Sequence, residues 1–286
     1  MNQPLTQQSH QYFRLLAIAG SDSGGGAGIQ ADLKTFAALG CFGMTAITAL
    51  TAQNTTGVRA IFGVPPQMLS DQIDAVVEDI GVDAVKVGML HSPAIVLAVA
   101  EAIDRHGLRN VVLDPVMVAT SGAVLIDNPA IEVLVRELFG RTALVTPNLD
   151  EAALLVGRPL LTEGDMQAAA YELLAKGAQA VLIKGGHLAG DVVSDLLIVG
   201  SGAPHWMRAA RIPTANTHGT GCTLSSAIAA HLGLGLGLVE AVEAARAYVR
   251  GALAAGALVK TGRGGGPLNH SHAPQAMRVK PLGANG

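Results

Sequence analysis

The chain alternates short runs of apolar residues with longer stretches that have the periodicity of amphipathic helices. Six apolar runs predict strands, at residues 14–19, 44–50, 84–87, 111–114, 144–146 and 180–184. The intervening stretches predict helices at about residues 28–39, 66–80, 93–106, 129–139, 149–156 and 165–176. Strands that are apolar throughout, joined by helical crossovers, indicate an α/β fold with a mostly parallel sheet and helices on both faces.

The pattern changes near residue 190. Residues 192–199 and 207–212 are apolar runs joined by a Gly- and Pro-containing turn, which predicts an antiparallel edge of the sheet. Two further helices are expected at about residues 220–232 and 238–259, followed by a glycine-rich segment at 262–267. The sequence therefore predicts one layered α/β unit that ends in a glycine-rich tail.

No run of proline, serine or charge marks a linker between domains. We therefore expect a single domain over residues 13–272, a flexible segment at 1–12 and a tail at 273–286. Residues 1–12 are polar and have no basic start followed by an apolar stretch, so no signal peptide is expected. The most apolar helices are too short or carry charges, so no membrane span is expected either.

Composition narrows the classes of protein. Apolar residues make up 50% of the 286 residues and charged residues 14%, which predicts a large buried core rather than disorder. The net charge of −3 gives no basic field for nucleic acid. The two cysteines, Cys41 and Cys222, form neither a disulfide framework nor a zinc site, and they fit a reducing cytoplasm.

The predicted sheet locates a binding site before any motif is considered, because ligands bind beyond the carboxyl ends of parallel strands. The segments that follow predicted strands are residues 20–28, 51–56, 88–91, 114–122, 146–151 and 185–187, and they are rich in Gly, Asp, Asn and Thr. The glycine run at 24–28 does not fit the GxGxxG spacing, and no Walker A loop is present. A Rossmann dehydrogenase and a P-loop ATPase therefore lose support.

The strongest local signal is residues 216–222, where Gly219, Thr220 and Gly221 precede a predicted helix that begins near Cys222. Uncovered amides at the positive end of a helix dipole form an anion hole suited to a transferring phosphoryl group. A thiol at a helix N-terminus is expected to have a lowered pKa, so Cys222 is a candidate base. The residues alone leave open a glycine-rich turn that caps a helix beside a buried cysteine.

Spaced blocks throughout the chain match one known family. They lie at residues 19–35, 48–55, 86–90, 112–117, 146–152, 184–187, 216–222 and 262–272. Over residues 14–272 the chain resembles the hydroxymethylpyrimidine/phosphomethylpyrimidine kinases of thiamine biosynthesis, which belong to the ribokinase-like superfamily. The resemblance implies ATP-dependent phosphorylation of 4-amino-5-hydroxymethyl-2-methylpyrimidine and then of its monophosphate. It also implies a homodimer.

The resemblance implies a substrate pocket formed by Gln53, Gly20, Asp32, Met89 and Val116. The side-chain amide of Gln53 would pair with the amino group and adjacent nitrogen of the pyrimidine. Gly20 would permit close approach, Met89 and Val116 would cover the ring, and Asp32 would approach the hydroxymethyl group. Without the family, Met89 and Val116 read equally well as core residues, and Asp32 as a residue that complements a helix dipole.

On the nucleotide side, the resemblance implies ATP contacts from Asp114, Asn148 and Lys184. Asp114 and Glu151 are the expected ligands of Mg²⁺, which prefers oxygen donors and bridges nucleotide phosphates. Asn148 and Glu151 could instead only cap a helix, and Lys184 could be a solvated lysine. His187 and His218 are given no catalytic role.

The expected mechanism has Cys222 helping to deprotonate the hydroxymethyl oxygen, which attacks the γ-phosphorus in line. The amides of Gly219, Thr220, Gly221 and Cys222, together with Mg²⁺, would carry the developing charge. A pyridoxal or pyridoxine kinase on the same scaffold is the nearest alternative, and a non-catalytic pyrimidine-binding protein is a second. The sequence leaves the extent of pyridoxal side activity open.

Overall fold

The computed structural model describes residues 8–118, 126 and 128–283. Its centre is an eight-stranded sheet in the order β11-β10-β9-β8-β7-β6-β2-β3. The strands are β2 (Arg14–Ala19), β3 (Phe42–Ile47), β6 (Ala84–Val87), β7 (Val111–Leu113), β8 (Leu144–Val145), β9 (Ala180–Ile183), β10 (Val192–Val199) and β11 (His205–Ala210). All neighbours from β3 to β9 are parallel, whereas β10 is antiparallel to both β9 and β11. The predicted mostly parallel sheet with an antiparallel edge is confirmed.

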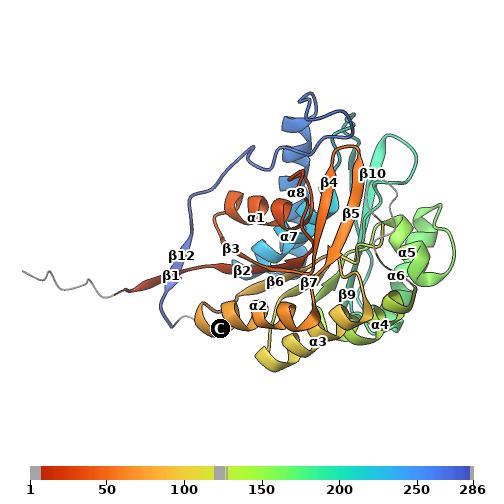
Figure 1. The fold of residues 1–286 in the computed structure, drawn as a ribbon. Coiled ribbons are helices and arrows are strands. Elements are labelled where there is room, and N and C mark those ends of the chain that lie inside the picture. Colours follow the sequence, from red (N-terminus) through yellow and green to blue (C-terminus); the bar gives the residue numbers. More distant parts are fainter. Residues whose placement is uncertain (1–7, 119–125, 127, 284–286) are drawn as a thin grey trace, which may run out of the picture.

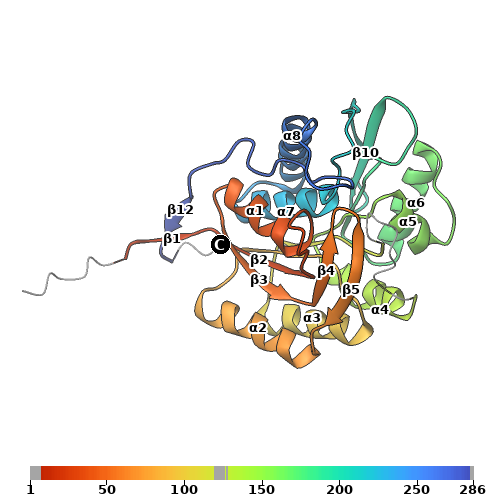
Figure 2. The same ribbon diagram turned by 45° about the horizontal axis from the view of Figure 1, so that its top comes forward.

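Helices cover both faces of this sheet, as the sequence predicted (Figures 1 and 2). One face carries α1 (Gly28–Ala38), α7 (Thr220–Gly233) and α8 (Leu238–Gly256). The other carries α2 (Pro66–Asp79), α3 (Pro93–His106), α4 (Asn128–Leu138), α5 (Leu149–Val156) and α6 (Glu163–Ala175), and a 3-10 turn, Phe139–Arg141, follows α4. Along β2, Leu15 and Ala17 pack with the first group, and Leu16 and Ile18 with the second. The alternation explains why this strand is apolar throughout.

A hairpin of β4 (Ala49–Asn54) and β5 (Gly57–Gly63) stands away from the central sheet as a separate two-stranded sheet (Figure 1). The predicted strand at 44–50 was therefore wrong in extent, and β5 was not predicted. The chain leaves the central sheet at Thr48, whose hydroxyl donates to the Met89 carbonyl at 2.8 Å. Met89 is 41 positions away in the sequence, so the local periodicity around Thr48 does not indicate that the strand ends there.

The two ends of the described chain meet. Strand β1 (His10–Tyr12) pairs antiparallel with β12 (Val279–Pro281), although both lie in segments that were expected to flank the domain, 1–12 and 273–286. The ring of Tyr12 stacks on Phe42 with centroids 6.0 Å apart, which ties this ribbon to the edge strand β3. Within the described residues, every helix is too short or too polar to cross a bilayer.

Candidate active site

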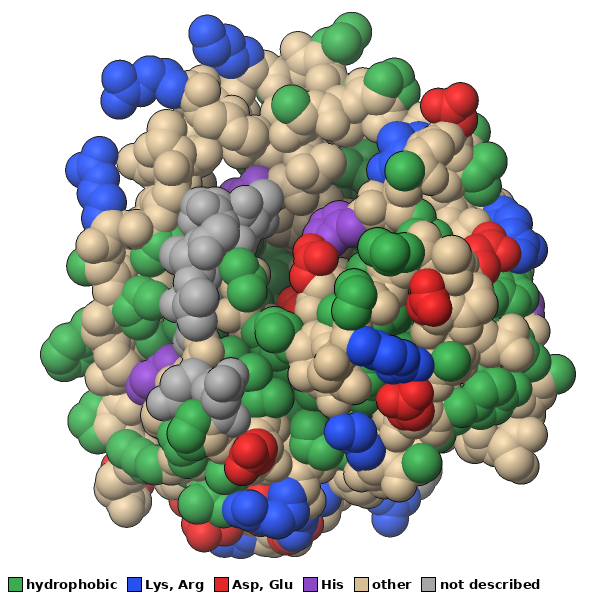
Figure 3. Space-filling model, turned by 90° about the vertical axis from the view of Figure 1, so that its right-hand side faces the viewer, with side chains coloured by type: hydrophobic (Ala, Val, Ile, Leu, Met, Phe, Trp, Pro, Cys, Tyr) green, Lys and Arg blue, Asp and Glu red, His purple; other side chains and the backbone are tan. Residues whose placement is uncertain are grey.

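A cavity of about 720 Å³ opens beyond the carboxyl ends of the parallel strands. Asp114, Thr146 and Lys184 each lie one residue past the end of a strand, β7, β8 and β9 respectively. Twelve of the predicted site residues line the cavity: Gly20, Gln53, Met89, Asp114, Val116, Asn148, Glu151, Lys184, Gly219, Thr220, Gly221 and Cys222. The space-filling view of the side that lies to the right in Figure 1 shows a hollow with acidic and histidine side chains beside it (Figure 3).

The N-terminus of α7 points into this cavity. Gly219 is the N-cap, with a left-handed φ of 82°, and a Cβ at this position would collide with the Gly26 carbonyl oxygen. The first bond inside the helix is donated by the Thr223 amide to Gly219 O, so the amides of Gly221 and Cys222 have no carbonyl partner within the helix. The predicted glycine-rich turn before a helix is present, and it leaves donors free for an anion.

The predicted low pKa of Cys222 is wrong. Burial raises the pKa of this thiol to about 11, although the charge of Lys86 opposes the rise. The carboxylates of Asp32 and Asp114 raise it further. Helix position alone favours a thiolate, but the loss of water outweighs it here. The thiol is therefore neutral near pH 7 in the ligand-free protein.

Asp32 lies beneath the cavity rather than in its wall. Its side chain and that of Lys86 are both 0% exposed, and Lys86 Nζ lies 2.9 and 3.0 Å from the two carboxylate oxygens. Ser226 donates a further hydrogen bond to Asp32 Oδ1 at 2.7 Å. The cavity is lined instead by Lys86, which sequence reasoning did not single out because it lies within an apolar strand.

A second lysine joins the nucleotide-side residues. Lys184 Nζ lies 2.7 Å from Asp114 Oδ1 and 3.6 Å from Glu151 Oε2. Burial opposes the ionisation of Asp114, but the charges of Lys184 and Lys86 hold its pKa below the ordinary value. Burial raises the pKa of Glu151 to about 7, and the charge of Asp114 adds to the rise. In this cluster one lysine ammonium thus lies between two buried carboxylates.

Asn148 and Glu151 do cap a helix. Asn148 Oδ1 accepts the Glu151 amide at 2.9 Å, and Glu151 Oε2 accepts the Asn148 amide at 2.7 Å, which is a capping box at the start of α5. Both residues also line the cavity. The structural and ligand-binding interpretations are therefore compatible, because the cap leaves Glu151 Oε1 and the side-chain amide nitrogen of Asn148 available.

Gln53 lies on β4, where a register shift between Ala52 and Gln53 interrupts the pairing with β5. Its side chain reaches the cavity beside His218, with the two Nε2 atoms 3.4 Å apart. His218 in turn contacts Asp22, with His218 Nε2 lying 2.9 Å from Asp22 Oδ2. Neither Asp22 nor His218 was assigned a role from the sequence. The two residues are 196 positions apart, so no local pattern indicates that they form a pair.

The far end of the cavity is formed by residues that sequence reasoning missed. Arg246 donates to Asp195 Oδ2 at 2.7 Å, and the Gly185 amide donates to Asp195 Oδ1 at 2.8 Å. Arg211 donates to the carbonyls of Gly186, Leu188 and Gly190, and so holds the loop after β9 in place. Apolar groups complete the wall: Leu224, Val249 and Leu253.

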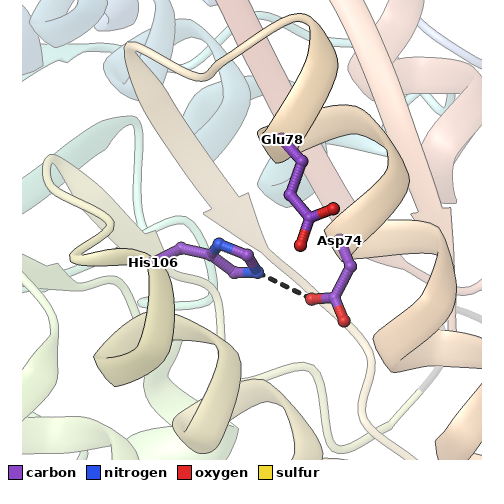
Figure 4. Close-up of side chains that lie close together, drawn as sticks. All are labelled: Asp74, Glu78 and His106. Carbon is purple, nitrogen blue, oxygen red and sulfur yellow. Dashed lines mark hydrogen bonds and ion pairs between the residues drawn. The ribbon is translucent and has the colours of Figure 1, made fainter.

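One further cluster of titratable groups lies away from the cavity, on α2 and α3 (Figure 4). Asp74, Glu78 and His106 have side-chain ligand atoms within 4.8 Å of one another. Asp74 Oδ1 is already bound by His106 Nε2 and by Arg105, each at 2.6 Å. Arg105 therefore supplies the carboxylate with a counter-charge from the protein, and we assign the cluster no role in the site.

The chain is similar to known small-molecule kinases. The family model described as "Phosphomethylpyrimidine kinase" matches residues 22–269. A hydroxymethylpyrimidine/phosphomethylpyrimidine kinase of Rhizobium meliloti (strain 1021) is 51% identical over 258 residues, which cover 90% of this chain and 96% of the relative. The corresponding kinase of Escherichia coli (strain K12) is 46% identical over 259 residues, which cover 90% and 97%.

Solved structures of related kinases have the same fold. The crystal structure of phosphomethylpyrimidine kinase from Clostridium difficile 630 matches with a TM-score of 0.73 and 42% identity, over 83% of this chain and 97% of that one. An ADP complex of Bacillus subtilis pyridoxal kinase matches with a TM-score of 0.85 and 37% identity, over 92% and 98%. The fold is ribokinase-like, and the chain belongs to the phosphomethylpyrimidine kinase family.

Proposed function

We propose that this protein transfers the γ-phosphoryl group of ATP to 4-amino-5-hydroxymethyl-2-methylpyrimidine, and then to the resulting monophosphate, in thiamine biosynthesis. The observation that carries the proposal is a single cavity with an aminopyrimidine-compatible amide, Gln53, and the free N-terminus of α7 in its wall. Relatives that bear this two-step activity in their names are 51% and 46% identical to the chain. Pyridoxal kinase of Staphylococcus aureus, 34% identical, has been solved with AMP-PCP and pyridoxal, which supports ATP as co-substrate.

The pyrimidine ring would lie between Met89 and Val116, with Gln53 at its polar edge. Met89 is 7% exposed and contributes to the cavity wall, so it both packs in the core and faces the ligand. Gly20 lies against it: a Cβ on Gly20 would come within 3.1 Å of Met89 Sδ. A larger residue at 20 would push Met89 into the space of the ring. Asp32, in contrast, supports the pocket through Lys86 rather than by touching the substrate.

The triphosphate would lie along Lys184 toward the N-terminus of α7. Lys184 Nζ would lie 3.2 Å from a Cβ at Gly221, so its charge and the free amides of the helix act on the same space. Asp114 and Glu151 fit Mg²⁺, because they are buried carboxylates close enough that the charge of Asp114 raises the pKa of Glu151. Mg²⁺ bound there would neutralise the phosphates, and Asn148 would contribute its amide to the nucleotide side.

In the first reaction the hydroxymethyl oxygen attacks the γ-phosphorus while the amides of Gly221 and Cys222 hold the equatorial oxygens. The Thr220 amide, which was expected to join them, donates instead to the Thr217 carbonyl at 3.2 Å. The proton acceptor would be the thiolate form of Cys222, which is scarce because the pKa of the thiol is about 11. In the second reaction the nucleophile is a phosphate oxygen that is already ionised near neutral pH. Only the first reaction therefore needs Cys222 as a base.

The deciding experiment measures ATP consumption with hydroxymethylpyrimidine, its monophosphate and pyridoxal in parallel. We expect turnover with the first two compounds and at most slow turnover with pyridoxal, which lacks the aminopyrimidine edge that Gln53 complements. Faster turnover with pyridoxal would identify a pyridoxal kinase. Binding of pyrimidine and ATP without turnover would identify a non-catalytic binding protein.

We also propose a homodimer and a cytoplasmic location. The hairpin exposes large apolar side chains, with Leu50 at 49%, Ile61 at 41% and Phe62 at 68%, and a second subunit would cover them. Both cysteines are free thiols, which suits a reducing compartment. Light scattering of the wild type and of Phe62→Ser tests the dimer, since the variant should shift the mass toward that of a monomer.

A further inference from the structure

The carboxylate of Asp22 determines that Nε2 of the His218 ring carries a hydrogen. Asp22 Oδ2 accepts hydrogen bonds from the amides of Gly26 at 3.0 Å and Ala27 at 2.8 Å, and Oδ1 accepts that of Gly24 at 2.8 Å. Burial opposes ionisation, but the hydrogen bonds from His218, Ala27 and Gly24 hold the pKa of Asp22 below its ordinary value. An ionised carboxylate can only accept. His218 Nε2, 2.9 Å from Oδ2, therefore carries a hydrogen.

This hydrogen restricts the neighbouring amide of Gln53. Gln53 Nε2 lies 3.4 Å from His218 Nε2, and Gln53 Oε1 lies 3.3 Å from Thr51 Oγ1. Thr51 has one hydroxyl hydrogen, and the Ser21 carbonyl at 2.8 Å takes it. In that orientation a donor of Gln53 faces a donor, and its acceptor faces an acceptor. Turning the amide over by 180° lets its nitrogen donate to Thr51 Oγ1. It also places its oxygen against the His218 Nε2 hydrogen, which Asp22 Oδ2 and Gln53 Oε1 then share.

We infer that the Asp22–His218 pair holds the Gln53 amide with its oxygen toward His218 and its nitrogen toward Thr51, and thereby sets the direction in which the substrate ring binds. The inference rests on the proposed pyrimidine kinase function. His218 is thus a positioning residue that acts through Gln53. In this orientation each donor faces an acceptor: His218 Nε2 faces Gln53 Oε1, and Gln53 Nε2 faces Thr51 Oγ1.

The direction of the amide decides where the reacting group of the substrate lies. After its contacts with His218 and Thr51, the Gln53 amide keeps one lone pair and one N–H at its outer end. The lone pair accepts from the 4-amino group of the pyrimidine, and the N–H donates to ring nitrogen N3. The amino group then lies on the His218 side, and the hydroxymethyl group beside it points toward Gly219 and Cys222. The reversed amide would turn the hydroxymethyl group away from the phosphoryl-transfer centre.

Packing keeps the histidine ring in this position. His218 is 9% exposed, and its amide donates to Gly266 O at 3.2 Å. A Cβ on Gly26 would come within 2.4 Å of His218 Cδ2, so only glycine leaves room for the ring. Gly26 therefore contributes to both residues of the pair: it leaves room for the His218 ring, and its amide donates to Asp22 Oδ2. The pair is held from both the loop before α1 and the loop before α7.

The test compares two ligands that differ in hydrogen-bond order. The 4-amino substrate presents a donor at C4 and an acceptor at N3, whereas its 4-oxo analogue presents an acceptor at C4 and a donor at N3. Isothermal titration gives the ratio of the two dissociation constants for wild type, His218→Leu and His218→Gln. We expect the wild type to favour the amino compound by about 1,000-fold or more. In His218→Leu the amide turns freely, and the ratio falls by at least about tenfold.

A purely structural role for His218 would weaken both ligands equally and leave the ratio unchanged, and that result overturns the inference. His218→Gln should keep most of the ratio, because its amide nitrogen can donate to Asp22. His187→Leu is the matched control: His187 also lines the cavity but bonds Asp150 at 2.8 Å, so the ratio should stay at the wild-type value.

A second measurement uses the wild type and does not depend on the folding of any variant. Nuclear Overhauser effects from the side-chain NH₂ of Gln53 should connect to the methyl group of Thr51. Effects to the ring hydrogens of His218 instead would overturn the inference. A wild type that neither binds nor phosphorylates the pyrimidine would refute the proposed function, but it would leave the measured amide orientation standing.

Discussion

Replacing Asp32 by leucine would leave the ammonium group of Lys86 in the protein interior without its counter-charge. Both side chains are 0% exposed and the closest N–O distance is 2.9 Å. At an effective dielectric constant of about 20, the attraction at this distance is about 6 kcal/mol. Asp114 also attracts Lys86, so it replaces a part of the loss. We therefore expect Asp32→Leu to lower the free energy of unfolding by about 3–5 kcal/mol.

The double variant Asp32→Leu/Lys86→Met separates charge from shape. It removes both charges and keeps the apolar volume, so it should recover most of the loss. A deficit of about 1 kcal/mol should remain, because the Ser226 hydroxyl loses its acceptor, Asp32 Oδ1. Lys86→Met alone should be about as unstable as Asp32→Leu, since it leaves a buried carboxylate. The coupling free energy between Asp32 and Lys86 that these values imply is several kcal/mol, which is well above the error of a double-mutant cycle.

Urea unfolding followed by circular dichroism measures these differences, and thermal melts check them at about 2–4 °C per kcal/mol. Glu172→Leu is the matched control, since Glu172 pairs with Arg158 at 2.6 Å but the two side chains are 46% and 38% exposed. It should change stability by less than about 1 kcal/mol. If Asp32→Leu and the double variant are equally unstable, the charge argument is refuted, and the loss comes from packing.

Three further results are expected. Gly219→Ala should lower kcat/KM by at least about 100-fold while circular dichroism stays native, because the Cβ would collide with Gly26 O at a left-handed φ of 82°. Because the pKa of the Cys222 thiol is about 11, the rate of the first phosphorylation should rise about tenfold per pH unit between pH 7 and 9 in the wild type. The same rate should not change with pH in Cys222→Ala, and the rate of the second phosphorylation should not change with pH in either protein. Glu151 has a raised pKa of about 7, so between its ordinary value of 4.5 and 7 the folded protein binds more protons than the unfolded chain. The free energy of unfolding should therefore fall by about 3 kcal/mol over that range in urea titrations, and Glu151→Gln should remove the fall.

The sheet could be predicted because its strands are buried on both faces, so their apolar runs stand out from the helices. The position of the site followed from the strand ends, and Asp114 and Lys184 lie where that rule expects them. The limits of the strand at 44–50 could not be predicted, since they depend on a hydrogen bond from Thr48 to the Met89 carbonyl. Local sequence therefore predicts the presence of a helix or strand well. It predicts the end of that helix or strand poorly wherever the hydrogen bond that ends it comes from a distant residue.

The electrostatics of the site were harder to predict than its location. A helix N-terminus favours a low thiol pKa, but Cys222 is so deeply buried that desolvation outweighs the helix dipole. Asp32 resembled a substrate contact until the structure paired it with Lys86, 54 positions away. Burial and pairing are properties of the folded chain, and no local pattern contains them.

Asp22, Asp32 and Asp114 are each paired with a cation or a histidine, and the three pairs differ in whether a ligand can replace one partner. Asp32 and Lys86 are 0% exposed and lie 2.9 Å apart, so an exchange of partners would leave a buried carboxylate without its counter-charge. Lys184 is 13% exposed and faces the cavity, so it can move from Asp114 to an incoming phosphate. That exchange would release the carboxylate of Asp114 at the moment when a divalent cation arrives with the nucleotide. Asp22 keeps His218 instead, because it also binds three amides that no ligand replaces.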